Sequence, residues 1–394
     1  MSTLALLSPL PPYPPHAGGT AHMFQATRQL SRFYDVSVYA LADDPTLVTW
    51  GPMPEWCAAL HAFPRDRRRS VALDPPAVQQ DRSPMLRTFL RAQWHGTPPD
   101  VVQLEFSTMA QYANLAREAG ALVVCTAHNV AFLAQLRRAR QERVPRVRVR
   151  RLLGALSLWQ YELRALGQCD LVVVHGEVDA AALRRWLPRL PIVYVPAGID
   201  LTDWPPRVNP GVEDEVLFVG NYAHPPNVEG ALWLVREVWP RVRAAHPTAR
   251  LTLAGRNPPP AVQALAAAAI RVPGTLENLH PLYTSASLVV APIFWGSGVR
   301  IKLLEALASG LPVVATPLAA EGMRLIDHES ALFAATPAAF AAAILRLLGD
   351  PVLRAQLGRA GRAVVERDYD WAQLGRRLAG LYAGAQAGLH NRAW

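Results

Sequence analysis

The sequence predicts an α/β protein made of two doubly wound domains in tandem. A chain of 394 residues is long enough for two domains, and an apolar content of 51% is enough to bury two cores. In both halves, short runs of Val, Ile and Leu alternate with segments of helical periodicity. Continuous apolar runs between helices are typical of parallel sheets that are covered on both faces.

Apolar runs place the strands of the first half. The first run, at 4–8, stops at a proline and is followed by a Pro/Gly loop over 9–19 and a helix over 20–33. Further β-branched runs follow, with helix-like segments between them. We expect these strands at 35–41, 101–106, 121–126, 170–175 and 191–195.

A polar, proline-bearing segment, DLTDWPPRVNPGVE, interrupts the alternation at 200–213. We therefore expect a first domain over 1–200, an interdomain linker over 201–214 and a second domain over 215–366. Residues 367–394 are expected to form a C-terminal helix and tail that packs back toward the first domain.

The second half repeats the pattern of the first. Apolar residues spaced three and four apart between Val228 and Val242 predict an amphipathic helix. The chain is expected to be helical from Pro337 onward. The expected strands are 215–219, 250–254, 270–272, 288–291 and 312–315.

Charge and composition limit the location and the partners. The net charge of +9 predicts an anionic partner, and Lys302 is the single lysine among 40 basic residues. No apolar run is long enough to span a bilayer, and the N-terminus lacks the basic start of a signal peptide. Three widely spaced cysteines argue against a disulfide framework or a thiolate zinc site. We therefore expect a cytoplasmic protein, with the inner face of the membrane as a further location.

The segment PIFWGSGVRIKLLEALASGLPVVAT, at 292–316, carries the strongest signal for chemistry. A glycine-rich turn precedes a predicted helix over 299–309, so backbone amides and the helix dipole can receive an anion. Arg300 and Lys302 lie in the first turn, where a cation opposes the dipole unless a phosphate is present. Glu305 is placed one turn further on to accept hydrogen bonds from ribose hydroxyls. The segment predicts a nucleotide-diphosphate sugar site, and an ordinary βαβ unit with solvated charges is the alternative.

The same segment resembles the donor-binding signature of the bacterial type of glycosyltransferase family 4, the group 1 transferases. The stretches at 217–258 and 272–292 are similar to the second domain of that family, and the first strand followed by Gly18-Gly19 is similar to its first domain. The resemblance implies the GT-B fold, in which two Rossmann-like domains face each other across a cleft. It also implies transfer of a sugar from a nucleotide-diphosphate sugar to a hydroxyl acceptor, with retention, in glycan or polysaccharide biosynthesis.

The sequence departs from the family in two places. Many members carry two glutamates seven residues apart; Glu305 matches the second, and Ser297 stands where the first would fall. Many also carry an Arg and a Lys at positions that look like Asn221 and Asn227 here. Arg300 and Lys302 are expected to take over the diphosphate and, with His128, to be the catalytic residues. The residues expected to bind the donor are Gly18, Gly19, Asn221, Gly296, Ser297, Gly298, Val299, Leu304 and Glu305.

In the first half, Gly18-Gly19 precedes a helix and is a candidate second anion loop. His128 ends the run ALVVCTAH, at the carboxyl end of a predicted strand, where ligands bind in such sheets. The resemblance implies that a histidine here contacts the donor sugar and the reaction centre, and the alternative is a histidine that caps the next helix. Glu105 ends another predicted strand and either faces the acceptor or is structural.

The triplet Asp368-Tyr369-Asp370 has the DxD spacing of metal-dependent transferases. Asp370 precedes an apolar helix that begins at Trp371, and with Gln373 it fits an N-cap and its capping-box partner. We therefore expect no metal ion and no cofactor besides the nucleotide-sugar co-substrate.

Eight arginines lie between Arg137 and Arg151, with Glu142 as the one acid. This stretch is either a solvated surface or a peripheral contact with anionic lipid, which gains about 1 kcal/mol per basic residue. Nucleic acid is not expected, because no aromatic stacking residues are interleaved with the charge. No amphipathic anchor is evident nearby, so membrane contact is expected to be reversible.

The acceptor is left open as a glycan, a lipid-linked molecule or a small molecule. Two rival functions fit the same fold. A nucleotide-sugar epimerase would need clustered acids and histidines, and a non-catalytic nucleotide-sugar-binding protein would fit the missing first glutamate.

Overall fold

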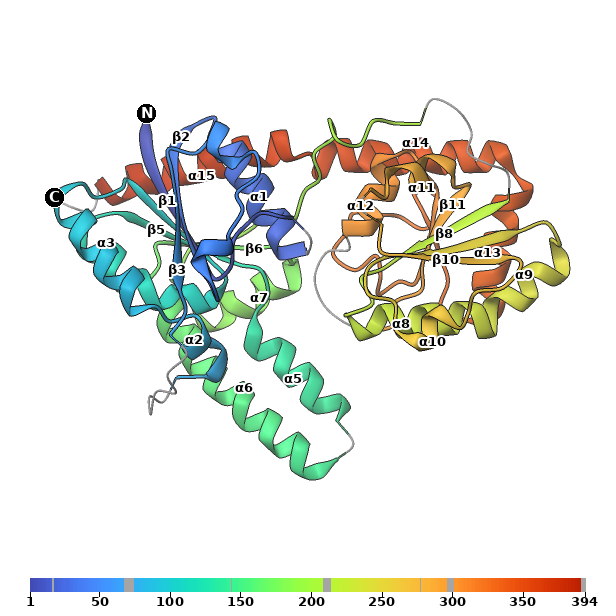
Figure 1. Ribbon diagram of the computed structural model, residues 1–394, viewed down its shortest axis with the longest axis horizontal. Coiled ribbons are helices and arrows are strands. Elements are labelled where there is room, and N and C mark those ends of the chain that lie inside the picture. The colour runs from blue at the N-terminus through green and yellow to red at the C-terminus, as the bar shows by residue number, and fades with distance from the viewer. Residues whose placement is uncertain are drawn as a thin grey trace. The chain divides into compact units, whose positions relative to one another are not determined.

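The computed structural model describes residues 1–15, 18–66, 74–142, 144–207, 214–276, 278–295 and 301–390. The chain divides into two compact units (Figure 1). The first unit is Met1–Ala197 together with Trp371–Trp394, and the second unit is Gly198–Asp370. Each unit is built around one parallel sheet with an apolar core on either face, which confirms the predicted fold class.

The sheet of the first unit has the strand order β3-β2-β1-β4-β5-β6-β7 in the described residues. Its strands are β1 (Ser2–Ser8), β2 (Tyr34–Ala42), β3 (Ala59–Pro64), β4 (Val101–Glu105), β5 (Leu122–Ala127), β6 (Leu171–Val174) and β7 (Ile192–Tyr194). Its helices are α1 (Gly18–Leu30), α2 (Pro76–Gln80), α3 (Pro84–Gly96), α4 (Ala113–Glu118), α5 (Ala131–Gln141), α6 (Pro145–Leu166), α7 (Glu177–Trp186) and α15 (Trp371–His390). Short 3-10 segments are η1 (Pro45–Leu47), η2 (Met53–Glu55) and η3 (Ser107–Tyr112).

The sheet of the second unit has the order β10-β9-β8-β11-β12-β13. Its strands are β8 (Glu215–Val219), β9 (Arg250–Ala254), β10 (Ile270–Gly274), β11 (Leu288–Ala291), β12 (Val313–Ala315) and β13 (Leu332–Phe333). Its helices are α8 (Pro225–Trp233), the π-helical segment η4 (Leu234–Val238), α9 (Trp239–Ala245), α10 (Pro260–Gln263), α11 (His280–Ser285), α12 (Ile301–Ala308), α13 (Pro337–Gly349) and α14 (Pro351–Asp368).

The apolar runs become buried strands because each strand supplies two cores in alternation. On β1, Leu4 and Leu6 join the core on one face of the sheet, and Ala5 and Leu7 join the core on the other. All four side chains are buried. A continuous apolar run is therefore what a central parallel strand requires.

Both expected domain boundaries differ in the structure, because the second unit begins at Gly198 rather than at residue 215 and ends at Asp370 rather than at residue 366. Residues 201–207 of the expected linker belong to the second unit, where Leu201 and Trp204 pack against a buried core. The second unit also extends to Asp370, and Tyr369 is buried in that same core. Helix α15 belongs to the first unit, because Trp371 and Tyr382 lie in its core.

Three elements differ from the sequence prediction. The strands β3 and β13 are not predicted: β3 is a partly exposed edge strand that begins Ala-Leu-His, and β13 has only two residues. The helix expected between Val228 and Val242 is divided by the π-helical segment η4. Pro240 follows this segment and has no N–H to donate to the preceding turn, which explains the interruption.

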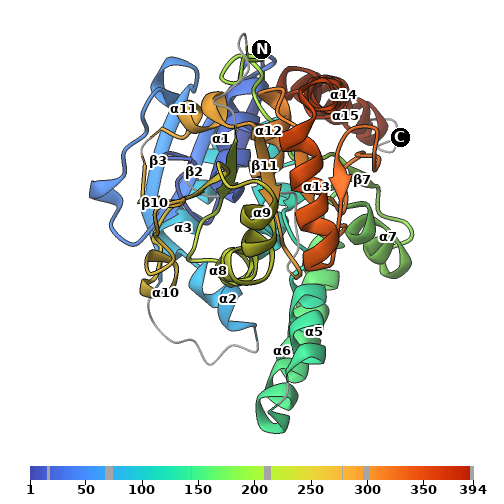
Figure 2. The same cartoon turned by 90° about the vertical axis from the view of Figure 1, so that its right-hand side faces the viewer.

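Helices α5 and α6 form an antiparallel hairpin that extends beyond the rest of the first unit (Figures 1 and 2). Its base is fixed by Glu162, a buried residue of α6 whose carboxylate accepts hydrogen bonds from the backbone N–H groups of Ala131 and Phe132, each at 3.0 Å. Glu162 therefore caps the N-terminus of α5 from the neighbouring helix. The arginines at 146–151 lie on α6 itself.

Candidate functional site

Each sheet has one point where the strand order reverses, and this point locates the candidate site. In the first sheet the reversal lies between β1 and β4, and in the second it lies between β8 and β11. In open parallel sheets, ligands bind outside the carboxyl ends of the strands at such points. In the first sheet near this point, Glu105 ends β4, and Gly18 and His128 follow β1 and β5. In the second sheet, Asn221 follows β8 and Lys302 follows β11.

In the first unit, Gly19 lies against the side chain of Phe106. A Cβ atom at position 19 would stand 2.8 Å from the Phe106 ring, so a side chain there would force the ring to shift. Phe106 itself has a φ of 66° and a ψ of 147°, a region that a bulky residue rarely adopts. Gly18 begins helix α1, and His16 and Ala17 just before it lie outside the described residues.

Phe106 and Glu105 together hold His128. The rings of Phe106 and His128 are stacked, with centroids 4.0 Å apart and an interplanar angle of 16°. Atom Nε2 of His128 lies 2.6 Å from Oε2 of Glu105, and both side chains are buried. Glu105 also accepts a hydrogen bond from the side-chain amide of Gln103. The amide oxygen Oε1 of Gln103 in turn accepts a hydrogen bond of 3.0 Å from the hydroxyl of Tyr382. The sequence interpretation left Glu105 open, and the structure places it as the partner of His128.

Two further histidines, which the sequence analysis did not single out, complete a histidine cluster of His22, His128 and His175. The His22 ring lies 4.0 Å from that of His175 and 5.0 Å from that of His128, between centroids. Burial, followed by the nearby His128, lowers the pKa of His175 to about 3. Burial, followed by His175 and His128, lowers the pKa of His22 well below its usual range. The described cluster therefore includes two imidazoles that are neutral at pH 7.

In the second unit, Lys302 lies in the first turn of α12, and Asn227 of α8 binds it. The ammonium Nζ is 2.7 Å from Oδ1 of Asn227 and 4.7 Å from the centroid of the Phe218 ring. Asn227 in turn donates from Nδ2 to the carbonyl oxygen of Asn221 at 2.7 Å. These contacts link Asn221, Asn227 and Lys302 at the point where the strand order reverses.

Glu305, one turn after Lys302, is paired with a residue that the sequence analysis did not identify. Its Oε2 accepts a hydrogen bond of 2.7 Å from the hydroxyl of Tyr283, which is fully buried. Burial raises the pKa of Glu305, against the opposing effects of the Tyr283 hydrogen bond and the charge of Lys302. Leu304, predicted to bind the donor, has a fully buried side chain in the core, so only its backbone is available for such a contact.

The glycine-rich turn of the motif, Gly296, Ser297, Gly298, Val299 and Arg300, lies outside the described residues. The chain just before it is held in two ways. Trp295 donates from Nε1 to Oε2 of Glu229 at 2.6 Å. A Cβ atom at position 230 would lie 2.4 Å from the carbonyl oxygen of Pro292. Because Gly230 has no Cβ, α8 can approach this segment closely.

Within the DxD triplet, the carboxylate of Asp368 pairs with Arg367 at 2.7 Å and with Arg324 at 3.8 Å. The backbone of Asp370 forms a parallel β-bridge with Ile199. In the part of the chain that the structure describes, no group of three or more His, Cys, Asp or Glu residues is arranged to hold a metal ion. The same part contains no helix that is both long and apolar enough to cross a bilayer.

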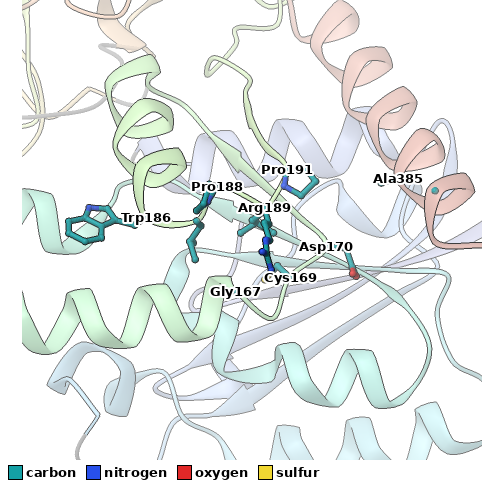
Figure 3. Close-up of a pocket in the computed structure, with 11 residues that line it drawn as sticks. Gly167, Cys169, Asp170, Trp186, Pro188, Arg189, Pro191 and Ala385 are labelled. Atoms are coloured by element: carbon teal, nitrogen blue, oxygen red, sulfur yellow. The ribbon is translucent and has the colours of Figure 1, made fainter. Parts of the chain in front are cut away.

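A pocket of about 640 Å³ lies at the other end of the first sheet (Figure 3). It is lined by Asp170, which precedes β6, and by Trp186 and Arg189, which lie at and after the end of α7. This is the amino end of β6, whereas His175 follows the carboxyl end of the same strand. The pocket is therefore separate from the histidine cluster.

Comparisons with known proteins agree in both halves of the chain. Residues 16–203 match the family model described as Glycosyltransferase Family 4, and residues 213–350 match the model described as Glycosyl transferases group 1. The chain is 29% identical to glycogen synthase of Mycobacterium tuberculosis over 212 residues. The aligned region covers 50% of this chain and 49% of that protein. It is 30% identical to a phosphatidyl-myo-inositol mannosyltransferase of Mycobacterium leprae over 180 residues, and this aligned region covers 44% of this chain and 47% of that protein.

These matches thus span about half the length of the curated relatives. Among solved structures, the fold is similar to that of sucrose-phosphate synthase from Thermosynechococcus elongatus, with a TM-score of 0.75 at 20% identity. That similarity covers 98% of this chain and 100% of the other. It confirms the GT-B fold that the sequence predicts.

Proposed function

We propose that this chain, which belongs to the group 1 transferases of glycosyltransferase family 4, transfers a sugar from a nucleotide-diphosphate sugar to a hydroxyl acceptor. Transfer with retention at the anomeric carbon follows the family. The observation that carries the proposal is Lys302, the one lysine of the chain. It is held by Asn227 at the start of α12, next to the point where the second sheet reverses its order, with Glu305 one turn away.

The proposed mechanism stabilises the departing diphosphate by charge. Lys302 and Arg300, with the backbone amides of 296–299, bind the phosphates as negative charge develops on them, and each such donor typically contributes a few kcal/mol. Glu305 accepts hydrogen bonds from the ribose hydroxyls. His128, oriented by Glu105, contacts the donor sugar. The leaving phosphate accepts the proton of the acceptor hydroxyl, and we propose that no metal ion takes part.

The acceptor class and the location are also proposals. The mannosyltransferase relative is named for phosphatidyl-myo-inositol, which supports a lipid-linked acceptor for this chain. Glycan and small-molecule acceptors fit the same transfer chemistry. We place the reaction in the cytoplasm, at the inner face of the membrane where the acceptor is a lipid.

A panel of nucleotide-diphosphate sugars tests the proposal. The purified chain is incubated with each donor, without an acceptor, and free nucleoside diphosphate and new sugar nucleotides are measured. A transferase should release nucleoside diphosphate slowly by transferring the sugar to water, and Lys302→Met should suppress this release. A new sugar nucleotide would instead identify an epimerase, and binding of donor without any turnover would identify a non-catalytic binding protein.

A further inference from the structure

Helix α6 carries an apolar strip that nothing in the described structure covers. Its members are Val149, Leu152, Leu153 and Leu156, with exposed fractions of 56%, 39%, 63% and 51%. They are spaced three and four residues apart, so they share one face of the helix, within an arc of about 100°. No amphipathic anchor is expected near the arginines from the sequence, and this strip shows that the expectation was wrong.

The strip lies on the side of α6 that faces away from the hairpin partner. The opposite side packs against α5 and is buried at Ala155, Leu158 and Glu162. The hairpin is therefore stabilised without the strip. Three residues beyond Leu156, Trp159 packs edge-on against Trp186, which is 48% exposed, so the apolar surface continues to the end of α7.

Arginines border the strip on both sides. On the helical projection Arg148 lies along one edge of the strip, and Arg146 and Arg150 lie along the other. Three more arginines extend from α5, and these six residues are all exposed: Arg137, Arg138, Arg140, Arg146, Arg148 and Arg150.

None of these six arginines forms an ion pair with any residue that the structure describes. Arg151 differs, because it pairs with Glu142 at 3.2 Å and donates to the carbonyl of Arg138 at 3.5 Å. Arg151 therefore helps to close the hairpin, and the six exposed arginines are available to an external partner.

We propose that the α5–α6 hairpin is a membrane-docking element whose α6 strip inserts into the interfacial region of an anionic bilayer. A helix with leucines on one face and arginines at its borders lies in the plane of the interface, with its apolar side chains below the headgroups. The aliphatic stems of the arginines follow the apolar surface while their guanidinium groups bind lipid phosphates. Trp186 occupies a position suited to the headgroup region, where exposed tryptophan is enriched.

The charge pattern favours a membrane over a second copy of the chain. Two strips packed together would bring two sets of six unpaired arginines close to one another, and like charges repel. An anionic bilayer supplies counter-charge to the arginines and an apolar layer to the leucines at once. This inference goes beyond the proposed transfer reaction and stands even if that reaction is wrong.

The first experiment measures sedimentation of the full chain with vesicles of phosphatidylglycerol and phosphatidylcholine, at about 0.1 M and about 1 M salt. The wild type should bind at both, more weakly at high salt, because screening removes the arginine contribution and leaves the apolar one. Replacing Leu152, Leu153 and Leu156 with Gln, which keeps helix propensity, should lower affinity at least about tenfold at low salt and abolish binding at high salt.

Charge variants separate the two contributions. Replacing Arg140, Arg146, Arg148 and Arg150 with Gln should lower affinity for anionic vesicles at least about tenfold and make the remaining binding less sensitive to salt, since only Arg137 and Arg138 of the six remain. The matched control replaces four exposed arginines elsewhere, Arg32, Arg91, Arg236 and Arg241. A second control replaces three exposed apolar residues, Leu47, Met85 and Val352, with Gln. Both controls should bind as the wild type does.

Insertion itself is measured with an environment-sensitive fluorophore attached at Leu153→Cys. Its emission should shift to the blue on anionic vesicles, and the same label at Met85→Cys should not respond. Two native cysteines are buried and the third, Cys57, is partly buried, with a pKa raised by burial to about 12, so background labelling should be small.

Three results would overturn the proposal. One is failure of the wild type to bind anionic vesicles at low salt. Another is an unchanged affinity of the triple glutamine variant. The third is self-association of the wild type without lipid, by sedimentation equilibrium, that the same variant abolishes, because the strip would then be an interface between copies. Donor turnover is also measured on each variant without lipid. This measurement tests the transferase proposal independently of membrane binding.

Discussion

The histidine cluster of the first unit and the Lys302 site of the second occupy equivalent positions in their own sheets, but they are built in opposite ways. Both lie at the carboxyl ends of strands where the order reverses. In the first unit the polar rings are buried, and burial keeps His22 and His175 neutral at pH 7. In the second unit Lys302 is only partly buried, and its ammonium donates a hydrogen bond to the amide oxygen of Asn227.

This difference indicates that the two units have different roles in binding the donor. A buried neutral ring with fixed neighbours is suited to orienting a group such as His128, but it provides little attraction for an anion. A partly exposed cation that is positioned by a neutral amide can attract an anionic ligand. We therefore expect the negative charge of the donor to be bound mainly by the second unit.

The largest effect is expected at Lys302. Lys302→Met should weaken nucleoside diphosphate binding about 100-fold, or about 2.7 kcal/mol, because it removes one partner of a charged interaction. Free nucleoside, which lacks the phosphates, should bind with unchanged affinity. Isothermal titration calorimetry with both ligands measures the difference.

A conservative variant sharpens that test. Lys302→Arg keeps the charge and should restore most of the affinity, whereas Asn227→Ala removes only the group that positions the ammonium and should have an intermediate effect. Equal losses for nucleoside and nucleoside diphosphate in Lys302→Met would contradict the phosphate role.

The next effect concerns the acid stability of the first unit. His22 and His175 take up protons in the unfolded chain near their usual pKa of 6.5, but not in the folded unit. Their contribution to stability is therefore complete above about pH 6.5 and is lost as pH falls from there toward 3. Each group can lose up to about 1.4 kcal/mol per pH unit, so His175, whose pKa is lowered to about 3, accounts by itself for a loss of about 2 kcal/mol by pH 5.

Scanning calorimetry between pH 7 and pH 5 measures this loss. His175→Asn removes one titrating ring while keeping a donor for the carbonyl of Val195, and it should flatten the pH dependence of the first unit. His95→Asn, at an exposed position on α3, is the matched control and should leave the dependence unchanged. A first unit whose stability does not change with pH would show that these histidines are not held neutral.

The sequence is most informative where one local pattern determines the structure. The strands at 215–219, 250–254 and 288–291 are found with their exact limits, because each is a buried apolar run between clear breaks. The edge strand β3 is missed, because half-exposed strands need few β-branched residues. The strip on α6 is missed because the arginines dominate the local pattern.

The candidate site is harder to predict, because its pairs are distant in sequence. Lys302 and Glu305 follow from a motif, but the partners Asn227 and Tyr283 come from other elements. The rule that identified His128, a histidine at the end of a buried run, applies equally to His175 and could have identified it. His22 lies within a helix, and no local pattern connects it to the cluster.

His128 provides the third prediction, on turnover rather than affinity. His128→Ala should lower kcat at least about tenfold, or about 1.4 kcal/mol of barrier, while nucleotide binding persists. Glu105→Gln keeps an oxygen near the ring but removes its charge, so it should lower kcat less, shift the pH profile of kcat and leave the donor KM unchanged. Wild-type turnover in His128→Ala would assign the residue to capping the following helix.

The smallest effect is expected at Glu305. Glu305→Gln keeps the shape but loses charge-assisted bonds, so it should weaken donor affinity about fivefold, or about 1 kcal/mol. Burial raises the pKa of Glu305, so as pH falls through that raised value the wild-type carboxylate takes up a proton and its advantage over Glu305→Gln should disappear. Tyr283→Phe removes the paired hydroxyl and should lower the melting temperature slightly while changing affinity less. Glu305 would be a structural partner of Tyr283 rather than a ribose ligand if Glu305→Gln left donor affinity unchanged and lowered the melting temperature as much as Tyr283→Phe does.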